Sequence, residues 1–194
     1  RLIIMWGYAT HLKYRISTHN ASTTSNLTLL ISEWGSWDET SFYFDYPTPL
    51  RWNDRLIVMG RNSSGGAPAG EWGYTLWNTT TLSFNNPVWI VSFQITEPKG
   101  GLYANYAKIG DYILYGFTFN PAVGYCANIY FIYSPDKGAH WHHWNGTQYS
   151  SFPINGHSTL IYEWGGTADQ YIPQEGTYPM LDENNKLVIG ADVY

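Results

Sequence analysis

Short apolar segments that end at a glycine recur along the chain. They read RLIIMWG, RLIVMG, YILYG and KLVIG, and they begin at Arg1, Arg55, Tyr112 and Lys186. A turn signal (WND, GD or ENN) precedes the last three, and an extended piece (YPTPL, YANYAKI or YPMLD) precedes each turn. This order predicts two strands joined by a tight turn. The segments HLKYRIS, WGYTLW and NIYFIYS predict a third strand in successive units.

The apolar segments begin 54, 57 and 74 residues apart, and the extra length of the last interval falls within residues 149–175. We predict an all-β fold, a partial β-propeller of antiparallel four-stranded blades, with about three blades in the chain. A β-sandwich whose hairpins resemble one another is the alternative. No window has the 3.6-residue apolar period of a helix, so no helix is predicted.

Residues 1–194 are expected to form one propeller-like domain. Both ends fall in the same part of the repeating unit, so we expect the chain to be a fragment of a larger propeller, cut in mid-blade at each end. A closed propeller has about four to eight blades. An open stack of sheets would also expose strand edges that favour aggregation.

Charged residues are scarce, at 13% of the chain, whereas aromatic residues reach 18%. The formal net charge of −5 argues against nucleic acid as a partner, because neutralising phosphates requires clustered Lys and Arg. No apolar run approaches the ~18 residues that a membrane-spanning helix needs, so no membrane span is predicted. Aromatic side chains favour strands and also stack on sugar rings.

Cysteine and asparagine give opposite signals about the compartment. The single cysteine, Cys126, excludes an internal disulfide, which is typical of a reducing compartment. Five N-glycosylation acceptor patterns exceed the roughly two expected by chance, and we therefore predict an extracellular or surface-exposed protein. These predicted acceptors are Asn20, Asn26, Asn62, Asn78 and Asn145.

The string SPDKGAHW follows the apolar run NIYFIY and precedes the expected strand HHWNG. Asp136 is expected to accept hydrogen bonds from backbone N–H groups of the turn, and Ser134 to bond locally to the hairpin backbone. Gly138 is expected to supply a positive φ, and Trp141 to return a large ring to the core. This pattern resembles the Asp-box, or bacterial neuraminidase repeat, of propeller blades, which implies a structural role for these four residues.

The wider chain resembles the Asp-box-related propellers that include ulvan lyases and uncharacterised secreted proteins. The resemblance rests on LIIMWGYATHLKYRIST, YPTPLRWNDRLIVMGR, YANYAKIGDYILYGFT with NIYFIYSPDKGAHW, and YPMLDENNKLVIG. In such lyases a tyrosine heads the first strand of a hairpin and an arginine ends the second. Tyr46 and Arg61 match these positions, which implies catalytic roles for both, and His11 lies near a family histidine in a looser register.

Other chemistry has weaker signals. A sialidase needs three arginines drawn from different blades, but no arginine follows residue 61, which argues against that activity. His140 and His142 of HWHHW would share a face if they lay on one strand, yet an exposed strand face is the simpler interpretation, and no metal site is predicted. No cofactor is predicted either.

Two function classes follow from these observations. The first is a non-catalytic module that binds a glycan or polysaccharide, or that assembles with other subunits in an extracellular structure such as an envelope, filament or virion. Sparse charge, abundant aromatic residues and the acceptor patterns favour it. The alternative is a polysaccharide lyase that cleaves uronate-containing polysaccharide by β-elimination, using Tyr46, Arg61 and His11.

Overall fold

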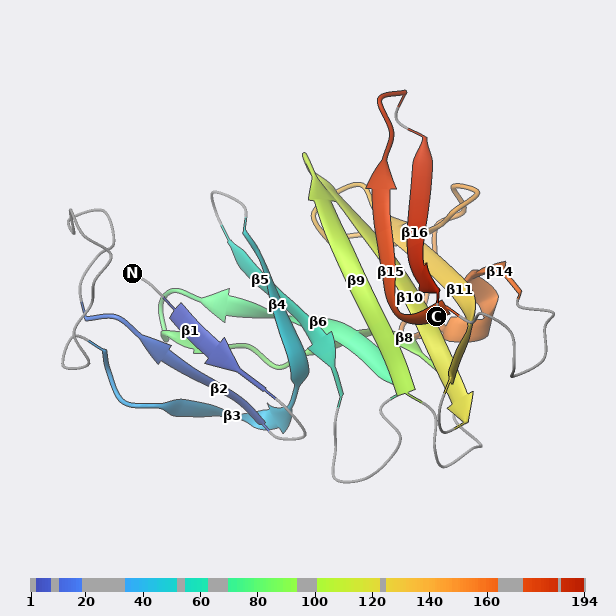
Figure 1. Ribbon diagram of the computed structural model, residues 1–194. Helices are drawn as coiled ribbons and strands as arrows, with labels where there is room; N and C mark the ends of the chain where they lie inside the picture. Colours follow the sequence, from blue (N-terminus) through green and yellow to red (C-terminus); the bar gives the residue numbers. More distant parts are fainter. Residues whose placement is uncertain are drawn as a thin grey trace. The chain divides into compact units, whose positions relative to one another are not determined.

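A computed structural model describes residues 3–7, 11–18, 34–51, 55–62, 70–93, 101–122, 125–163, 173–184 and 186–193. The described chain is all-β: its sheets are mainly antiparallel, and one short 3-10 turn is its only helical segment (Figure 1). The chain divides into two units, Arg1–Ala67 with Gly73–Val88, and Pro68–Trp72 with Trp89–Tyr194. No helix among the described residues has the length and apolar character needed to cross a bilayer.

The first unit contains a three-stranded sheet in the order β1-β2-β3, followed by a hairpin of β4 and β5 that continues to β6. The strands of this unit are β1 (Ile3–Trp6), β2 (His11–Ile16), β3 (Asp38–Tyr43), β4 (Asp45–Arg51), β5 (Leu56–Arg61), most of β6 (Glu71–Asn78) and β7 (Ser83–Phe84). All pairs with a printed register are antiparallel. The expected strands HLKYRIS and WGYTLW correspond to β2 and β6.

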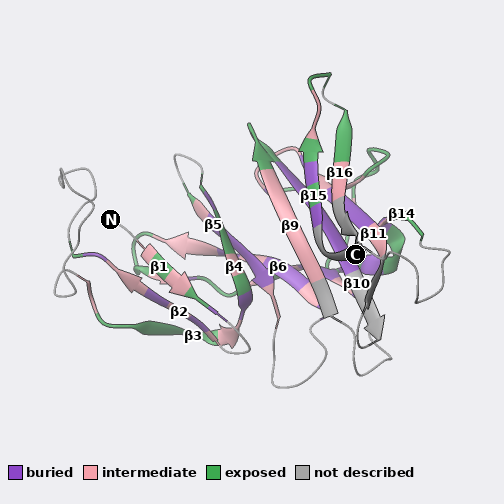
Figure 2. Cartoon of the chain, viewed as in Figure 1, coloured by how far each residue is buried: buried purple, intermediate pink, exposed green. Residues whose placement is uncertain are grey.

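Alternation along β2 separates its two faces. Leu12 and Tyr14 are buried, and the Tyr14 ring contacts Trp77 and Phe84 edge-on. His11, Lys13 and Arg15 lie on the opposite, partly exposed face. In contrast, four consecutive residues of β5 are buried, so this strand is covered on both faces. Figure 2 shows the difference between the mostly exposed β3 and the mostly buried β5.

The second unit is built on β9, β10 and β11, which pair in that order, with β12 and β14 both pairing with β11. A second hairpin, β15 with β16, packs against β9, β10 and β11. The elements are β8 (Val88–Ser92), β9 (Gly101–Ile109), β10 (Tyr112–Ala122), β11 (Tyr125–Ser134), β12 (His142–His143), β13 (Ile154–Asn155), the 3-10 turn η4 (Gly156–Thr159), β14 (Leu160–Tyr162), β15 (Pro173–Leu181) and β16 (Leu187–Val193).

Two features of this unit depart from a simple antiparallel blade. The segment HHWNG supplies only the two-residue strand β12. The long stretch after Tyr149 supplies β13, the 3-10 turn and β14, and β13 pairs with β8 in parallel. Parallel partners need a crossover connection, and here β9 to β12 lie between the two strands in sequence.

Candidate functional site

Tyr46 and Arg61 lie together at the open end of the β4–β5 hairpin. Asp45 and Arg61 are register partners, and a β-bulge follows between Asp45 and Thr48. Tyr46 sits in this bulge with a φ of 52°. A tyrosine rarely adopts this left-handed conformation, and such strained residues cluster at functional sites. The bulge therefore turns Tyr46 out of the regular alternation of β4, and its side chain is exposed.

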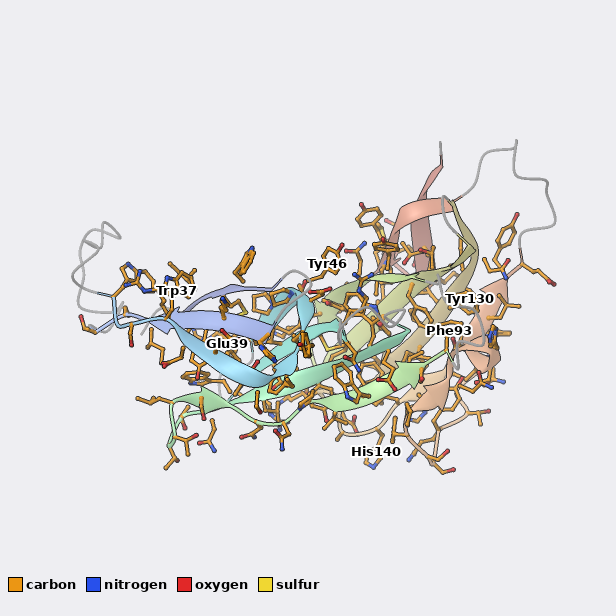
Figure 3. All side chains as sticks on the ribbon, turned by 90° about the horizontal axis from the view of Figure 1, so that it is seen from below. Trp37, Glu39, Tyr46, Phe93, Tyr130 and His140 are labelled. Atoms are coloured by element: carbon orange, nitrogen blue, oxygen red, sulfur yellow. The ribbon has the colours of Figure 1, made fainter. Side chains whose placement is uncertain are left out.

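The guanidinium of Arg61 lies over the ring of Tyr46, 4.7 Å from the ring centroid. Its Nη2 atom also lies 3.3 Å from Asp45 Oδ2. The side chains of Arg61 and Asp45 are only 12% and 3% exposed, so this ion pair is largely shielded from water. Removing one partner of such a pair is costly, because it leaves an uncompensated charge. Asp45 therefore fixes the position of Arg61 beside the exposed phenol of Tyr46, which Figure 3 labels.

The backbone of β1 supports the same site. The Tyr46 N–H donates a hydrogen bond to the Gly7 carbonyl at 3.3 Å. A Cβ atom at Gly7 would lie 2.2 Å from the Phe44 carbonyl oxygen, which is closer than real Cβ contacts. Glycine is therefore required where β1 ends, and it allows the chain to approach β4 directly beside Tyr46.

His11 belongs to a second cluster, on β2 and β3. Its Nδ1 lies 2.6 Å from Glu39 Oε1, and its ring lies 4.3 Å from the ring of Tyr43. Lys13 Nζ lies 3.6 Å from the other Glu39 oxygen. The hydrogen bond from His11 lowers the pKa of Glu39, and the nearby charges of Lys13 and His11 add to this effect against a burial penalty. The structure thus groups Tyr46 with Arg61, and His11 with Glu39.

The SPDKGAHW turn is closely hydrogen-bonded. Ser134 Oγ donates to Asp136 Oδ1 at 2.9 Å and accepts from the Gly138 N–H at 2.8 Å. Asp136 accepts from the His140 N–H at 2.8 Å, and its other oxygen lies 2.5 Å from His140 Nδ1. Gly138 has a φ of 87°, and Trp141 is 2% exposed. Ser134 is fully buried with its hydroxyl on Asp136, so this cluster presents no serine nucleophile.

The three histidines of HWHHW have different surroundings. His140 contacts Asp136, whereas His142 stacks on Tyr133 with ring centroids 5.3 Å apart. His143 contacts the rings of Trp144 and Tyr149. In the part of the chain that the structure describes, no three His, Cys, Asp or Glu side chains are grouped to hold a metal ion.

Three of the predicted glycosylation acceptors lie in described segments. Asn62 directly follows β5. Asn78 Oδ1 accepts from the Thr80 and Thr81 N–H groups, and Asn145 is exposed with its Oδ1 accepting from the Thr147 N–H. Asn20 and Asn26 lie outside the described residues, and modification of all five stays a prediction.

Two acidic residues of these clusters were not predicted. Asp45 directly precedes Tyr46, but nothing in the local sequence indicates an ion pair across the hairpin to Arg61. Glu39 lies 28 positions after His11, and its role depends on the pairing of β2 with β3. The sequence does show a carboxylate, Asp45, directly before the tyrosine that heads the expected strand, and that position is the signal by which Asp45 could have been found.

Comparison with solved structures identifies polysaccharide lyases as similar folds. An ulvan lyase of polysaccharide lyase family PL25 matches with a TM-score of 0.64 and 13% identity, over 94% of this chain and 42% of that structure. The same lyase bound to -[GlcA(1-4)Rha3S]- matches with a TM-score of 0.65 and 13% identity, over the same shares. The polysaccharide lyase Uly1 matches with a TM-score of 0.69 and 15% identity, over 91% of this chain and 44% of that structure.

These likenesses establish the fold class: the all-β architecture is that of β-propeller polysaccharide lyases. The chain spans less than half the length of each of these structures. No family model matches the chain, so its place in the Asp-box family stays a prediction. No curated protein matches its sequence. Each of these neighbours is described as a polysaccharide lyase, which is the activity of the second function class predicted from the sequence.

Proposed function

We propose that this chain carries catalytic residues of a polysaccharide lyase that cleaves a uronate-containing polysaccharide by β-elimination. The observation that carries the proposal is the contact between the Arg61 guanidinium and the exposed, backbone-strained Tyr46, 4.7 Å apart. Similarity to polysaccharide lyases adds support. Because such polymers are met outside cells, an extracellular location is part of the same proposal.

The reaction needs three contributions. A cation must neutralise the uronate carboxylate, because the adjacent C5 proton is otherwise too weakly acidic to remove. A base then takes the C5 proton, the C4–O bond breaks as the C4=C5 double bond forms, and an acid gives a proton to the departing oxygen. No water and no oxidant are consumed, and the products are one unsaturated uronate end and one free hydroxyl.

Arg61 is suited to the first role. Its planar guanidinium has five N–H donors in a geometry that matches the two oxygens of a carboxylate. Asp45 holds the group in one orientation, which lowers the entropy lost when the substrate binds. In this assignment Asp45 is a positioning residue, and Arg61 contacts the uronate.

Tyr46 and His11 are assigned the proton transfers. Tyr46 has an exposed phenol beside Arg61, and we assign it the proton donated to the leaving oxygen. Glu39 contacts His11 Nδ1 and orients the imidazole ring. His11 is the assigned base, and this role requires a substrate that extends from the His11–Glu39 cluster to the Tyr46–Arg61 pair.

The test uses the purified full-length protein with ulvan, alginate and polygalacturonate as uronate polymers and dextran as the neutral control. Ultraviolet absorbance detects the unsaturated uronate, and mass spectrometry confirms a product lighter by one water than the hydrolysis product. We expect the wild-type protein to act on at least one uronate polymer, and we expect the Arg61→Lys variant to be strongly impaired on that polymer. Absence of the unsaturated product from every uronate polymer would overturn the proposal.

A further inference from the structure

The outer face of the β1–β2–β3 sheet combines exposed indoles with cations. Register places Trp6 of β1 opposite Lys13 of β2, and Lys13 opposite Glu39 of β3. Residues directly opposite in an antiparallel pair share a face, and the buried Leu12 and Tyr14 occupy the other face. We call the surface formed by Trp6, His11, Lys13, Arg15, Trp37 and Glu39 the β2 track.

The β2 track contains two tryptophans whose side chains are exposed to solvent. Trp6 and Trp37 are each 52% exposed, although a large indole is highly buried on average. Flat aromatic faces of this kind stack on the apolar face of a sugar ring, whereas a simple solvated strand face does not require them. Figure 3 labels Glu39 on β3 and Trp37, which directly precedes that strand.

Arg15 is oriented before any ligand binds. Its Nε donates to the Gly35 carbonyl at 2.7 Å, and its guanidinium lies 5.4 Å from the centroid of Trp37. A guanidinium restrained in this way loses less entropy on binding an anion than a mobile surface side chain would. Arg15 and Trp37 therefore form one preorganised unit with a positive charge beside a flat ring.

The charge of the β2 track is opposite to that of the whole chain. The protein has only ten Lys and Arg and a net charge of −5. Even so, Lys13 and Arg15 share the track with His11, and Glu39, the carboxylate that faces them among the described residues, is already paired with Lys13 and His11. This local excess of cations is complementary to an anionic ligand.

The β2 track also leads toward Tyr46. Residues 11 to 15 span about 13 Å at the usual rise of a strand, which is longer than one sugar ring. Gly7, the residue after Trp6, accepts the hydrogen bond from the Tyr46 N–H. A polymer that lies along β2 can therefore continue to the Tyr46–Arg61 pair.

We propose that the β2 track binds an acidic polysaccharide, with Trp6 and Trp37 stacking on sugar rings and Lys13 and Arg15 pairing with carboxylate or sulfate groups. This binding surface rests on the proposed function for its polymer class, but it involves side chains outside the Tyr46–Arg61 pair. The β2 track would hold a long polymer beside the Tyr46–Arg61 pair.

The test measures binding by isothermal titration calorimetry in a Tyr46→Phe background, so that turnover does not destroy the ligand. The probes are alginate (carboxylate only), carrageenan (sulfate only) and dextran (neutral). Binding to either acidic polymer, weakened by added salt, is expected, and the polymer that binds identifies the anionic group. Binding without any lyase activity in the wild type would refute the proposed function alone. Lyase activity with unchanged affinity in the Arg15 and Trp37 variants would refute the binding surface alone, so the two proposals fail separately.

Variants within the β2 track should change affinity in opposite directions. Arg15→Gln and Trp37→Ala should each weaken binding about tenfold, because the first removes a charge-assisted contact and the second a stacking surface. Glu39→Gln should strengthen binding, since it removes the negative charge of Glu39 from the track, and a damaged fold cannot produce that gain. Trp144→Ala and Lys186→Gln remove an exposed indole and an exposed charge elsewhere and should bind as the parent does.

Four results would overturn the proposal. The first is that neither acidic polymer binds. The second is that the track variants and the control variants bind equally. The third is that the track variants change the oligomeric state, measured by light scattering, instead of the affinity. This third result would show that this face contacts a second copy of the chain. Protection of Trp6 and Trp37 from a fluorescence quencher in the ligand-free protein would also overturn it, because another part of the polypeptide would then cover the face.

Discussion

Gly116 of β10 lies so close to Thr177 of β15 that an added Cβ atom would be 3.2 Å from Thr177 Oγ1 and 3.3 Å from Pro179 Cδ. This close approach explains why one of the recurring apolar strands contains a glycine at its centre. A second hairpin packs directly over that position, and any side chain there would hold the two layers apart.

The recurring glycines Gly60, Gly116 and Gly190 should therefore differ in their tolerance of alanine. A Cβ at Gly60 would lie 2.3 Å from a Phe44 ring atom and 2.8 Å from the Asp45 carbonyl oxygen, whereas at Gly190 the nearest atom is 3.8 Å away. Gly60→Ala should cost about 1–3 kcal/mol of unfolding free energy, Gly116→Ala less, and Gly190→Ala about 0.5 kcal/mol or less. Urea unfolding measures the series, and an equal effect at all three positions would contradict it.

Trp141 anchors the SPDKGAHW turn in the core of the second unit. Because its indole is buried beside Gly138 and Tyr115, Trp141→Ala should lower the unfolding free energy by about 3–5 kcal/mol. Trp144→Ala, three residues further along and 57% exposed, is the matched control and should have an effect within about 0.5 kcal/mol. Thermal unfolding followed by circular dichroism compares the two, and similar midpoints would show that Trp141 is not part of the packed core.

Asp136 should make the protein acid-sensitive. Burial by itself raises the pKa of Asp136, but hydrogen bonds from the His140 ring and backbone and from Ser134 outweigh it and lower the pKa. The carboxylate therefore stabilises the fold fully above the ordinary value of 3.8, and this contribution is lost as the pH falls through the lowered pKa.

The comparison is between wild type and Asp136→Asn, with unfolding free energies measured from about pH 5 to about pH 2. The wild type should lose stability more steeply over this range than the variant, which lacks the titrating group. Parallel curves for the two proteins would refute a stabilising role for the ionised form.

Tyr115, unlike Asp136, has a raised pKa and, among the described residues, a side chain without a hydrogen bond. It is fully buried, burial raises its pKa well above 10.0, and its hydroxyl has no hydrogen-bond partner among the described residues. Deleting an unsatisfied hydroxyl removes a cost, so Tyr115→Phe should leave the unfolding free energy unchanged or raise it slightly. A loss greater than about 1 kcal/mol would reveal a partner for this hydroxyl.

The sequence predicted the long strands well. β2 alternates apolar and basic residues, and β6 and β11 are rich in aromatic residues. The hairpins at residues 103–116 and 178–190 have unambiguous turn signals, so local sequence was sufficient. The β3 strand was not assigned, because DETSFY is mostly polar and its position depends on pairing with β2. The same reason applies to β13, whose parallel pairing with β8 joins residues more than 60 positions apart.

Candidate sites were less predictable than strands. The resemblance to lyases identified Tyr46 and Arg61, but not the bulge that brings Tyr46 over the guanidinium. The sequence shows no run of basic residues at the β2 track, because His11, Lys13 and Arg15 alternate with other residues along β2. Their shared face emerges only when HLKYRIS is paired on both sides.

The most direct test of the account compares β-elimination by wild type, Tyr46→Phe and Tyr112→Phe, using the initial rate of unsaturated-uronate formation. Tyr112 is also an exposed tyrosine and serves as the control for losing a phenol. The account predicts a rate about a hundredfold lower for Tyr46→Phe, as expected for loss of a proton-transfer group, and an unchanged rate for Tyr112→Phe. Equal rates for Tyr46→Phe and wild type would contradict it.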